Sequence, residues 1–209
     1  MTDPGMQGID APAEVVARIR ETEGKGARVM VAVAGPPGAG KSTVSAALAR
    51  ALPEAAILPM DGFHLDNETL RARDLFARKG APETFDVSGL RALLERVRAG
   101  GEVRVPTFDR AADCVVPGGD VIPEAASIVI VEGNYLLLDE EGWRALHPFW
   151  DLTVMIDVPE DVLERRLVQR WLDHGLAPEA ALARARQNDL PNAARVRTAS
   201  VTADLVWRQ

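Results

Sequence analysis

Cysteine, lysine and long apolar runs are scarce in this sequence of 209 residues. The single cysteine, Cys114, excludes an internal disulfide and a zinc site built from several cysteines, and it fits a reducing compartment. No apolar run approaches the roughly 20 residues of a membrane-spanning helix. The first ten residues lack the basic and apolar regions of a secretory signal peptide. We therefore expect a cytoplasmic protein without membrane insertion.

Basic residues are outnumbered, with 24 lysines and arginines against 31 acidic residues and a formal net charge of −7. This surplus of negative charge repels phosphates, so we expect no duplex nucleic acid partner. Only Lys25, Lys41 and Lys79 are lysines. Because arginine supplies the other positive charges, a lysine at a special position is more informative than usual.

Apolar runs and helical patterns alternate along the chain, which predicts an α/β fold with a parallel sheet in one domain. Strands are predicted where short apolar runs fit burial on both faces. They span residues 28–34, 55–60, 127–131, 152–156 and 203–207. Helices are predicted at residues 12–23, 41–52, 67–79, 87–99, 159–174 and 178–189, the first of them packed outside the core. Prolines and glycines at 104–123 favour extended segments and turns.

A glycine-rich segment between the first expected strand and the following helix fits the phosphate-binding pattern G-x-x-x-x-G-K-[ST]. Its glycines let backbone N–H groups converge on phosphate oxygens, and the helix N-terminus adds a positive dipole end. The lysine is expected to reach the β- and γ-phosphates of ATP, and the serine hydroxyl to ligate Mg²⁺. The nucleotide-binding residues are thus Gly35, Pro36, Pro37, Gly38, Ala39, Gly40, Lys41, Ser42 and Thr43.

Two other interpretations of this segment are weaker. A dinucleotide fingerprint needs glycine where Pro37 stands, because the backbone must approach the pyrophosphate closely. A glycine-rich turn without a ligand would leave Lys41 and Ser42 unexplained.

Three carboxylates follow predicted strands, where open α/β sheets bind their ligands. Glu132 is our candidate for holding Mg²⁺ together with Ser42, and an ordinary loop carboxylate is its alternative. Asp61 is a candidate general base that would orient an acceptor hydroxyl, with a turn-capping role as its alternative. Asp157 precedes a proline and a helix, so we expect it to cap that helix.

These features and several further motifs resemble the uridine kinase, phosphoribulokinase and bacterial pantothenate kinase family of P-loop kinases over residues 28–189. The motifs are the segments at 60–64 (MDGFH), 81–86 (APETFD), 106–110 (PTFDR), 131–133 (VEG) and 165–170 (RRLVQR). The chain is most similar to a bacterial branch with the signatures DGFHLDN, RKGAPETFD, EGNYLLL and NDLPNA, whose members are often labelled fructose-transport kinases or fructokinases. Phe108 stands where uridine kinases usually have tyrosine, and Ala81 where histidine is common, so nucleoside specificity is not carried over.

The resemblance implies a P-loop NTPase-type parallel sheet flanked by helices, with a lid at 160–190 and substrate-pocket segments at 62–86 and 104–123. The helical spacing before residue 28 adds an N-terminal helical segment at 1–27 to the same single domain. The resemblance also implies that Asp61 and Lys41 are catalytic. Arg166 and Arg170, four residues apart on one helix face, would be catalytic lid arginines; the alternative is a solvated face paired with nearby acids. The substrate-binding candidates are Asp61, His64, Phe108, Asp109, Arg110 and Tyr135.

We therefore expect an ATP- and Mg²⁺-dependent kinase that phosphorylates an alcohol group of a small metabolite, with a sugar such as fructose as first choice. A nucleoside or a pantothenate-like alcohol is the alternative acceptor. Two hypotheses come from other functional classes: a partner-regulated ATPase and a nucleotide-binding module without catalysis. The sequence leaves open whether the protein forms a homodimer.

Overall fold

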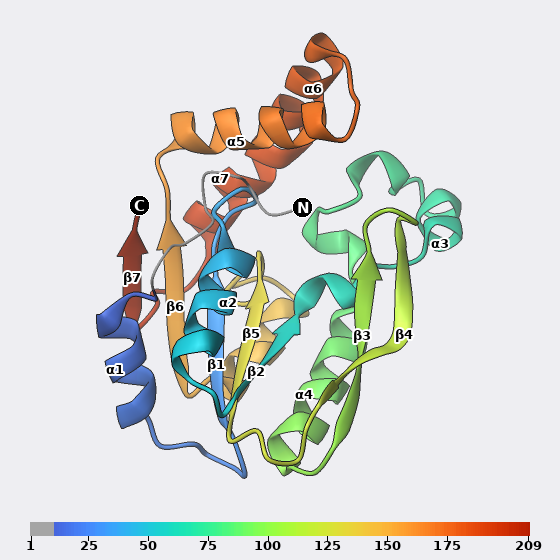
Figure 1. Ribbon diagram of the computed structural model, residues 1–209. Coiled ribbons are helices and arrows are strands. Elements are labelled where there is room, and N and C mark those ends of the chain that lie inside the picture. Colours follow the sequence, from blue (N-terminus) through green and yellow to red (C-terminus); the bar gives the residue numbers. More distant parts are fainter. Residues whose placement is uncertain (1–10) are drawn as a thin grey trace.

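The protein, a computed structural model described over residues 11–209, is built on a five-stranded parallel sheet (Figure 1). Residues 1–10, where the sequence predicts no signal peptide, lie outside the described residues. The strand order is β2-β5-β1-β6-β7, and every neighbouring pair is parallel, so the expected α/β fold is confirmed. The strands are β1 (Val29–Ala34), β2 (Ala55–Pro59), β5 (Ile128–Gly133), β6 (Leu152–Asp157) and β7 (Leu205–Arg208).

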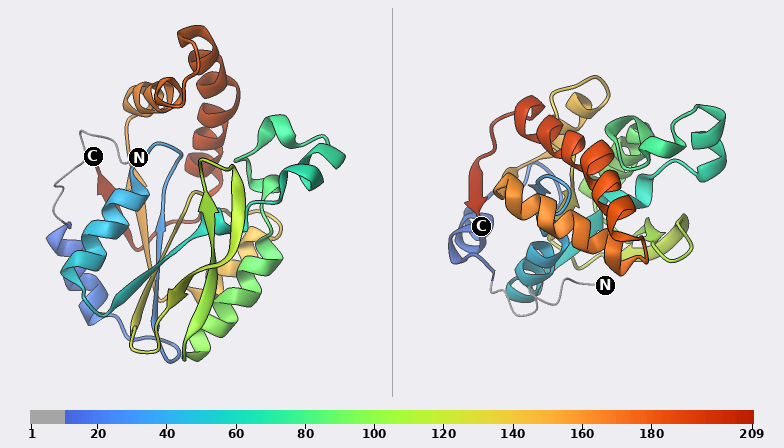
Figure 2. Two further views of the ribbon diagram at one scale, coloured as in Figure 1. Left: turned by 45° about the vertical axis from the view of Figure 1, so that its right-hand side comes forward. Right: turned by 90° about the horizontal axis from the view of Figure 1, so that it is seen from above.

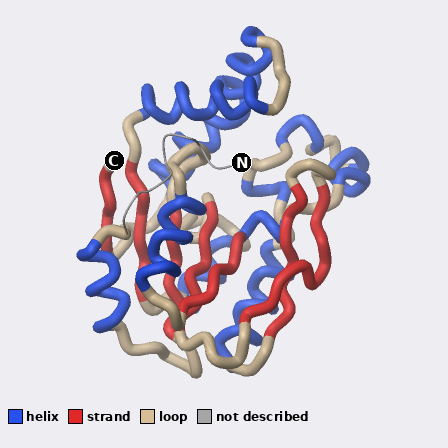
Figure 3. Tube along the Cα trace, viewed as in Figure 1, coloured by secondary structure: helices blue, strands red, loops and turns tan. Residues whose placement is uncertain are grey.

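Helices cover both faces of this sheet, so its central strands are apolar on both sides (Figure 2, left, and Figure 3). Val31 and Val33 of β1 pack with helices α1 (Ala13–Glu21) and α2 (Lys41–Ala51). Met30 and Ala32 point to the other face, because successive side chains of a strand alternate. That face is covered by α4 (Val87–Ala99), the 3₁₀ helix η5 (Trp143–Phe149) and the hairpin β3 (Val103–Asp109)–β4 (Cys114–Ile122).

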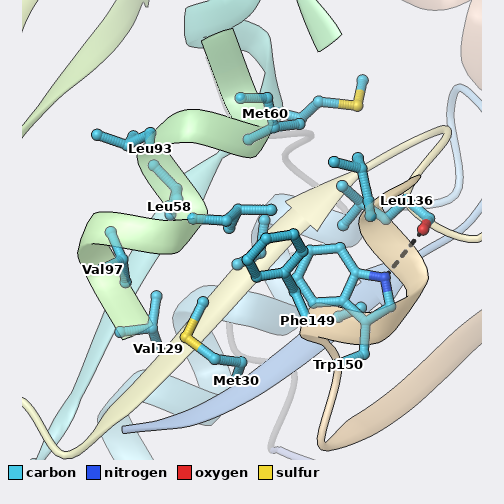
Figure 4. Packing of buried hydrophobic residues seen from close by; sticks show 14 of the residues in the cluster. Met30, Leu58, Met60, Leu93, Val97, Val129, Leu136, Phe149 and Trp150 are labelled. Atoms are coloured by element: carbon cyan, nitrogen blue, oxygen red, sulfur yellow. Dashed lines mark hydrogen bonds between the residues drawn. The ribbon is translucent and has the colours of Figure 1, made fainter. Parts of the chain in front are cut away.

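The aromatic residues of η5 and its C-terminal neighbour close the core on the second face (Figure 4). Trp143, Phe149 and Trp150 are all buried. The Trp150 indole N–H donates to the Leu136 carbonyl at 3.1 Å, so its polar edge is paired although the ring is buried.

The first helix does not lie outside the core as we expected. Val15 and Ile19 of α1 are 3% and 1% exposed and belong to the same apolar cluster as Val44 and Leu48 of α2. The helical periodicity was sufficient to find the helix, but only the packing shows that its apolar stripe is covered.

The insertion after β2 is more broken than the predicted helix at 67–79. It contains the 3₁₀ helix η2 (Met60–Phe63), then α3 (Asn67–Ala72), η3 (Phe76–Arg78) and η4 (Pro82–Thr84). Asp74 has a φ of 54°, which no α-helix accommodates, so α3 stops two residues before it.

The helical segment of residues 160–199 lies over the carboxyl ends of the strands (Figure 2, right). It comprises α5 (Glu160–Asp173), α6 (Pro178–Arg184), the π-helical turn η6 (Ala185–Asp189) and α7 (Leu190–Ala199). The helix predicted to end at residue 189 therefore continues through a π turn to Ala199, because Pro191 occupies the first turn of α7 and does not break it. Asn188, Asp189 and Asn192 are buried within this helical run.

Asp157 does not cap α5, contrary to our expectation, because no side chain caps that helix. Its carboxylate oxygens lie 3.7 Å from Arg208 Nε and 3.9 Å from Arg197 Nη2. Asp157 thus joins β6 to β7 and α7. No helix within residues 11–209 is long and apolar enough to cross a membrane.

Candidate active site

The glycine-rich loop joins β1 to α2 and has the geometry of a phosphate cradle. Gly38 and Gly40 have φ values of 80° and 83°, a region that side chains with a Cβ rarely adopt, and Gly40 directly precedes α2. The Lys41 Nζ donates to the Pro36 carbonyl at 3.0 Å, so the lysine folds back over its own loop. The loop amides, the helix N-terminus and the ammonium group therefore face one small region.

Ser42 and Glu132 meet although they are 90 residues apart. The Ser42 Oγ donates to Glu132 Oε1 at 2.8 Å, because parallel pairing aligns Glu132 of β5 with Val33 of β1. A hydroxyl beside a carboxylate is an oxygen donor set that suits Mg²⁺. No cluster of three or more His, Cys, Asp or Glu side chains that could hold a metal exists in residues 11–209.

Asp61 lies in η2, just beyond the end of β2, and its carboxylate is one-third exposed. Arg110, at the tip of the β3–β4 hairpin, donates from Nη2 to Asp61 Oδ2 at 3.2 Å. Gly62 makes this approach feasible, because a Cβ there would lie 2.3 Å from the Pro106 carbonyl oxygen of β3. The hairpin therefore delivers Arg110 to the carboxylate expected to act as the base.

Burial shifts the pKa values of Lys41 and Glu132. Desolvation lowers the pKa of Lys41 to about 8, although the nearby carboxylates of Glu132 and Asp61 oppose the shift. Desolvation also raises the pKa of Glu132, and the negative charge of Asp61 adds to the rise. A cation held by Ser42 and Glu132 would stabilise the ionised form of Glu132.

Aromatic rings form one wall beside Asp61. The His64 ring lies 4.2 Å from the Phe85 ring and 4.7 Å from the Phe108 ring, centroid to centroid. Its Nδ1 lies 2.9 Å from the Asp61 carbonyl oxygen, and burial lowers the pKa of His64. A neutral ring that donates from Nδ1 presents Nε2 as an acceptor for a hydroxyl.

Two expected substrate residues have structural tasks. Asp109 Oδ1 accepts from the backbone amides of Ala111 and Ala112, so this exposed carboxylate shapes the hairpin turn. Tyr135 is fully buried, which corrects our expectation that it touches substrate. Its hydroxyl donates to the Gly80 carbonyl at 2.6 Å and fixes the insertion to the core.

Arg166 and Arg170 of α5 contact groups outside their own helix, and the Arg170 side chain is 40% exposed. Arg166 Nη1 donates to Gln209 Oε1 at 3.1 Å and, more weakly, to the Gly38 carbonyl at 3.4 Å. Arg170 Nη2 lies 3.4 Å from Asp189 Oδ1 in the π turn. The acids of α5 pair with Arg165, Arg186, Arg197 and Gln169 instead.

Sequence reasoning assigned no role to Lys79, which joins the insertion after β2 to the β3–β4 hairpin. Its Nζ donates to Asn67 Oδ1 and Asp113 Oδ1, both at 2.7 Å, and lies 5.0 Å from the Phe108 ring centroid. The rarity of lysine was a signal that could have singled it out. Helix α6 and the π turn η6 reach the same segment, because Arg184 Nη2 and Asn188 Nδ2 both donate to the Lys79 carbonyl at 3.2 Å.

Comparison with known proteins agrees with this geometry. Residues 30–185 match the Phosphoribulokinase / Uridine kinase family. The chain is 40% identical over 185 residues to the uncharacterized protein YggC of Escherichia coli K12, covering 86% of this chain and 77% of that protein. It is 35% identical over 196 residues to a candidate uridine kinase of Schizosaccharomyces pombe, covering 87% and 83%.

A solved structure from Silicibacter sp. TM1040, named as a candidate fructose transport system kinase, superposes with a TM-score of 0.88. The two chains are 47% identical, and the match covers 92% of this chain and 96% of the other. The resemblance stated from the sequence motifs is thus confirmed. This chain belongs to the Phosphoribulokinase / Uridine kinase family and is an ATP-dependent kinase.

Proposed function

We propose that this kinase transfers the γ-phosphoryl group of ATP to a hydroxyl of a small sugar, with fructose as the first acceptor to test. The observation that carries the proposal is the Asp61–Arg110 pair, which lies within electrostatic reach of Lys41 and Glu132. A carboxylate at this position can orient an acceptor hydroxyl towards the phosphates held by the glycine-rich loop.

In this reaction the acceptor oxygen forms a bond to the γ-phosphorus while the bond from that phosphorus to the β-γ bridging oxygen breaks. ADP leaves, and Asp61 takes the hydroxyl proton late in the step. Lys41 and the loop amides hold the β- and γ-phosphates, and Arg170 and Arg166 neutralise charge on the transferred group. Ser42 and Glu132 would hold Mg²⁺, which screens the phosphate charge when bound.

The sugar acceptor is supported by the chemistry beside Asp61. Arg110 and the His64 Nε2 offer a donor and an acceptor for hydroxyl groups, next to the ring of Phe108. The name of the 47%-identical relative points to the same substrate class. A nucleoside or a pantothenate-like alcohol is the second choice, supported by the uridine kinase name of the yeast relative.

The experiment measures ADP release from Mg-ATP with fructose, other sugars, uridine, cytidine, pantothenate and no acceptor. One acceptor should raise the rate far above the blank. Asp61→Asn should then lower kcat by about 10²- to 10⁴-fold and change the Kd of ATP less than threefold, because the base acts on the hydroxyl. Asp120→Asn, an exposed aspartate of β4, is the matched control and should keep full activity.

Two results would overturn the proposal. Near-normal turnover of Asp61→Asn would remove Asp61 from its role as base. Equal ADP release in every well, blank included, would favour a partner-regulated ATPase over a small-molecule kinase.

A further inference from the structure

Asp189 is a buried carboxylate that the phosphoryl-transfer scheme does not use. It is 5% exposed and is the last residue of the π turn η6. Its Oδ2 accepts from the Trp171 indole N–H at 2.6 Å, and its Oδ1 lies 3.4 Å from Arg170 Nη2. Both partners belong to α5. The carboxylate of Asp189 in η6 therefore fixes two consecutive side chains of that helix.

The π turn explains how this residue reaches α5. A π turn inserts an extra residue into an α-helix and shifts the residues around it to new faces. Here it buries Asn188 and Asp189 together, and the two reach different neighbours: Asn188 donates to the Lys79 carbonyl, whereas Asp189 accepts from α5. In a regular α-helix, consecutive residues point about 100° apart. Wider π turns such as this one occur often at functional sites.

Arg170 is the partner whose placement matters for chemistry. Burial lowers the pKa of Arg170, and the charges that act on it are those of Asp189, Arg110, Asp61 and Arg184. Its guanidinium contacts the buried Asp189 carboxylate at 3.4 Å and is within electrostatic range of the Asp61–Arg110 pair, and the side chain is 40% exposed. The Trp171 ring supports this arrangement, because the guanidinium carbons of Arg170 and Arg184 lie 5.2 and 5.3 Å from its centroid.

Burying a carboxylate costs desolvation free energy, which an apolar side chain at a position that only needs packing would not. An ionised carboxylate loses its hydration on burial, so it persists where charged and hydrogen-bonding partners compensate for that loss. The indole N–H supplies one such partner and Arg170 the other. The indole fixes one oxygen, which leaves the second oxygen in a defined direction towards the guanidinium.

We propose that Asp189 is a positioning residue that holds the Arg170 guanidinium towards the transferred phosphoryl group, with Trp171 fixing the carboxylate in turn. This inference rests on the proposed function, in which Arg170 neutralises charge in the transition state. It adds a residue that acts on the reaction only through Arg170.

The first test is Asp189→Asn, which keeps the shape of the side chain and one acceptor oxygen for Trp171. An amide oxygen on the indole leaves an amide N–H₂ towards Arg170, so two donors face each other. We expect kcat to fall about 10- to 100-fold, as a misplaced catalytic group causes, and the KM of ATP to change less than twofold. Asp173→Asn, on the same helix and bonded to Gln169, is the control and should keep wild-type kcat.

Double-mutant analysis separates positioning from a merely structural role. In the Arg170→Ala background, Asp189→Asn should lower kcat by less than twofold, because the group it positions is gone. Trp171→Phe, which removes only the indole donor, should lower kcat about threefold and should also lose its effect in the Arg170→Ala background. Full additivity of Asp189→Asn and Arg170→Ala would overturn the proposal, and so would wild-type kcat in folded Asp189→Asn.

A binding measurement tests the inference even if no acceptor is found. Calorimetric titration with Mg-ADP should give the same Kd for wild type and Asp189→Asn, within twofold. With aluminium fluoride present as a mimic of the transferred phosphoryl group, Asp189→Asn should bind Mg-ADP about tenfold more weakly than wild type. Equal affinities with aluminium fluoride overturn the positioning role, whereas absence of any acceptor-dependent turnover by wild type overturns the sugar kinase proposal alone.

Discussion

Lys41 and Lys79 are two largely buried lysines that stand beside the same site and are held in different ways. Lys41 donates to the carbonyl of Pro36, five residues away in its own loop. Lys79 bonds to Asn67 and to Asp113, 34 residues further along the chain, and lies near the ring of Phe108. The phosphate-binding loop, the proposed donor half of the site, is thus largely local in sequence, whereas the proposed acceptor half is assembled from separate segments.

This difference teaches where substrate specificity can vary. The phosphate cradle depends on one contiguous loop and its pairing of β1 with β5, so its chemistry is constant wherever the motif folds. The acceptor wall depends on how the insertion, the hairpin and the lid pack against one another. Tyr135 in the core donates to the Gly80 carbonyl, and Arg184 and Asn188 of the C-terminal helices donate to the carbonyls of Ala77 and Lys79.

The largest effect should follow from removing the donor-side lysine. Lys41→Ala should lower kcat on the order of 10³-fold or more, because it deletes a positive charge aimed at the β- and γ-phosphates. Steady-state ADP release checks this, with thermal unfolding as the folding control. Turnover within tenfold of wild type would show that the loop amides suffice without the ammonium group.

The pH dependence of the Kd of ATP tests the role of Lys41 on the donor side. Burial lowers the pKa of Lys41 to about 8, so the free enzyme loses the lysine charge as pH rises through that value. ATP phosphates favour the charged form, so the Kd of ATP should be flat below about pH 7 and rise by up to tenfold per pH unit above about 8. Calorimetry should also show proton uptake on binding at pH 9. Lys41→Met should bind weakly with no such rise, and a wild-type Kd that stays flat to pH 9.5 would contradict the role of the lysine.

The smallest effect should come from the acceptor-side lysine. Lys79→Met keeps most of the apolar stem but removes the bonds to Asn67 and Asp113, so the wall should loosen. We expect the KM of the acceptor to rise about fivefold, which corresponds to about 1 kcal/mol, with the KM of ATP unchanged. Lys25→Met is the matched control, since Lys25 bonds to the carbonyl of Trp150 instead. An equal rise in both KM values would contradict the division of the site into a donor half and an acceptor half.

Much of the fold could be predicted because local patterns specify it. The central strands are short valine-rich runs, and helix α4 at 87–99 has the predicted bounds, fixed by the side chain of Asp86 at its start and by Gly100 at its end. The apolar stripe of α1 was visible too, but whether Val15 and Ile19 are covered depends on α2, which lies elsewhere in the chain.

The sequence by itself determined the phosphate loop, because the glycines, Lys41 and Ser42 act as neighbours along one segment. It also marked Asp61 and Glu132, because both follow apolar strands of a parallel sheet. Only the tertiary structure decided that Tyr135 serves the core, that Lys79 braces the acceptor wall and that the chain from Pro178 continues through a π turn to Ala199. These outcomes depend on contacts between residues tens of positions apart, which no local pattern of residues encodes.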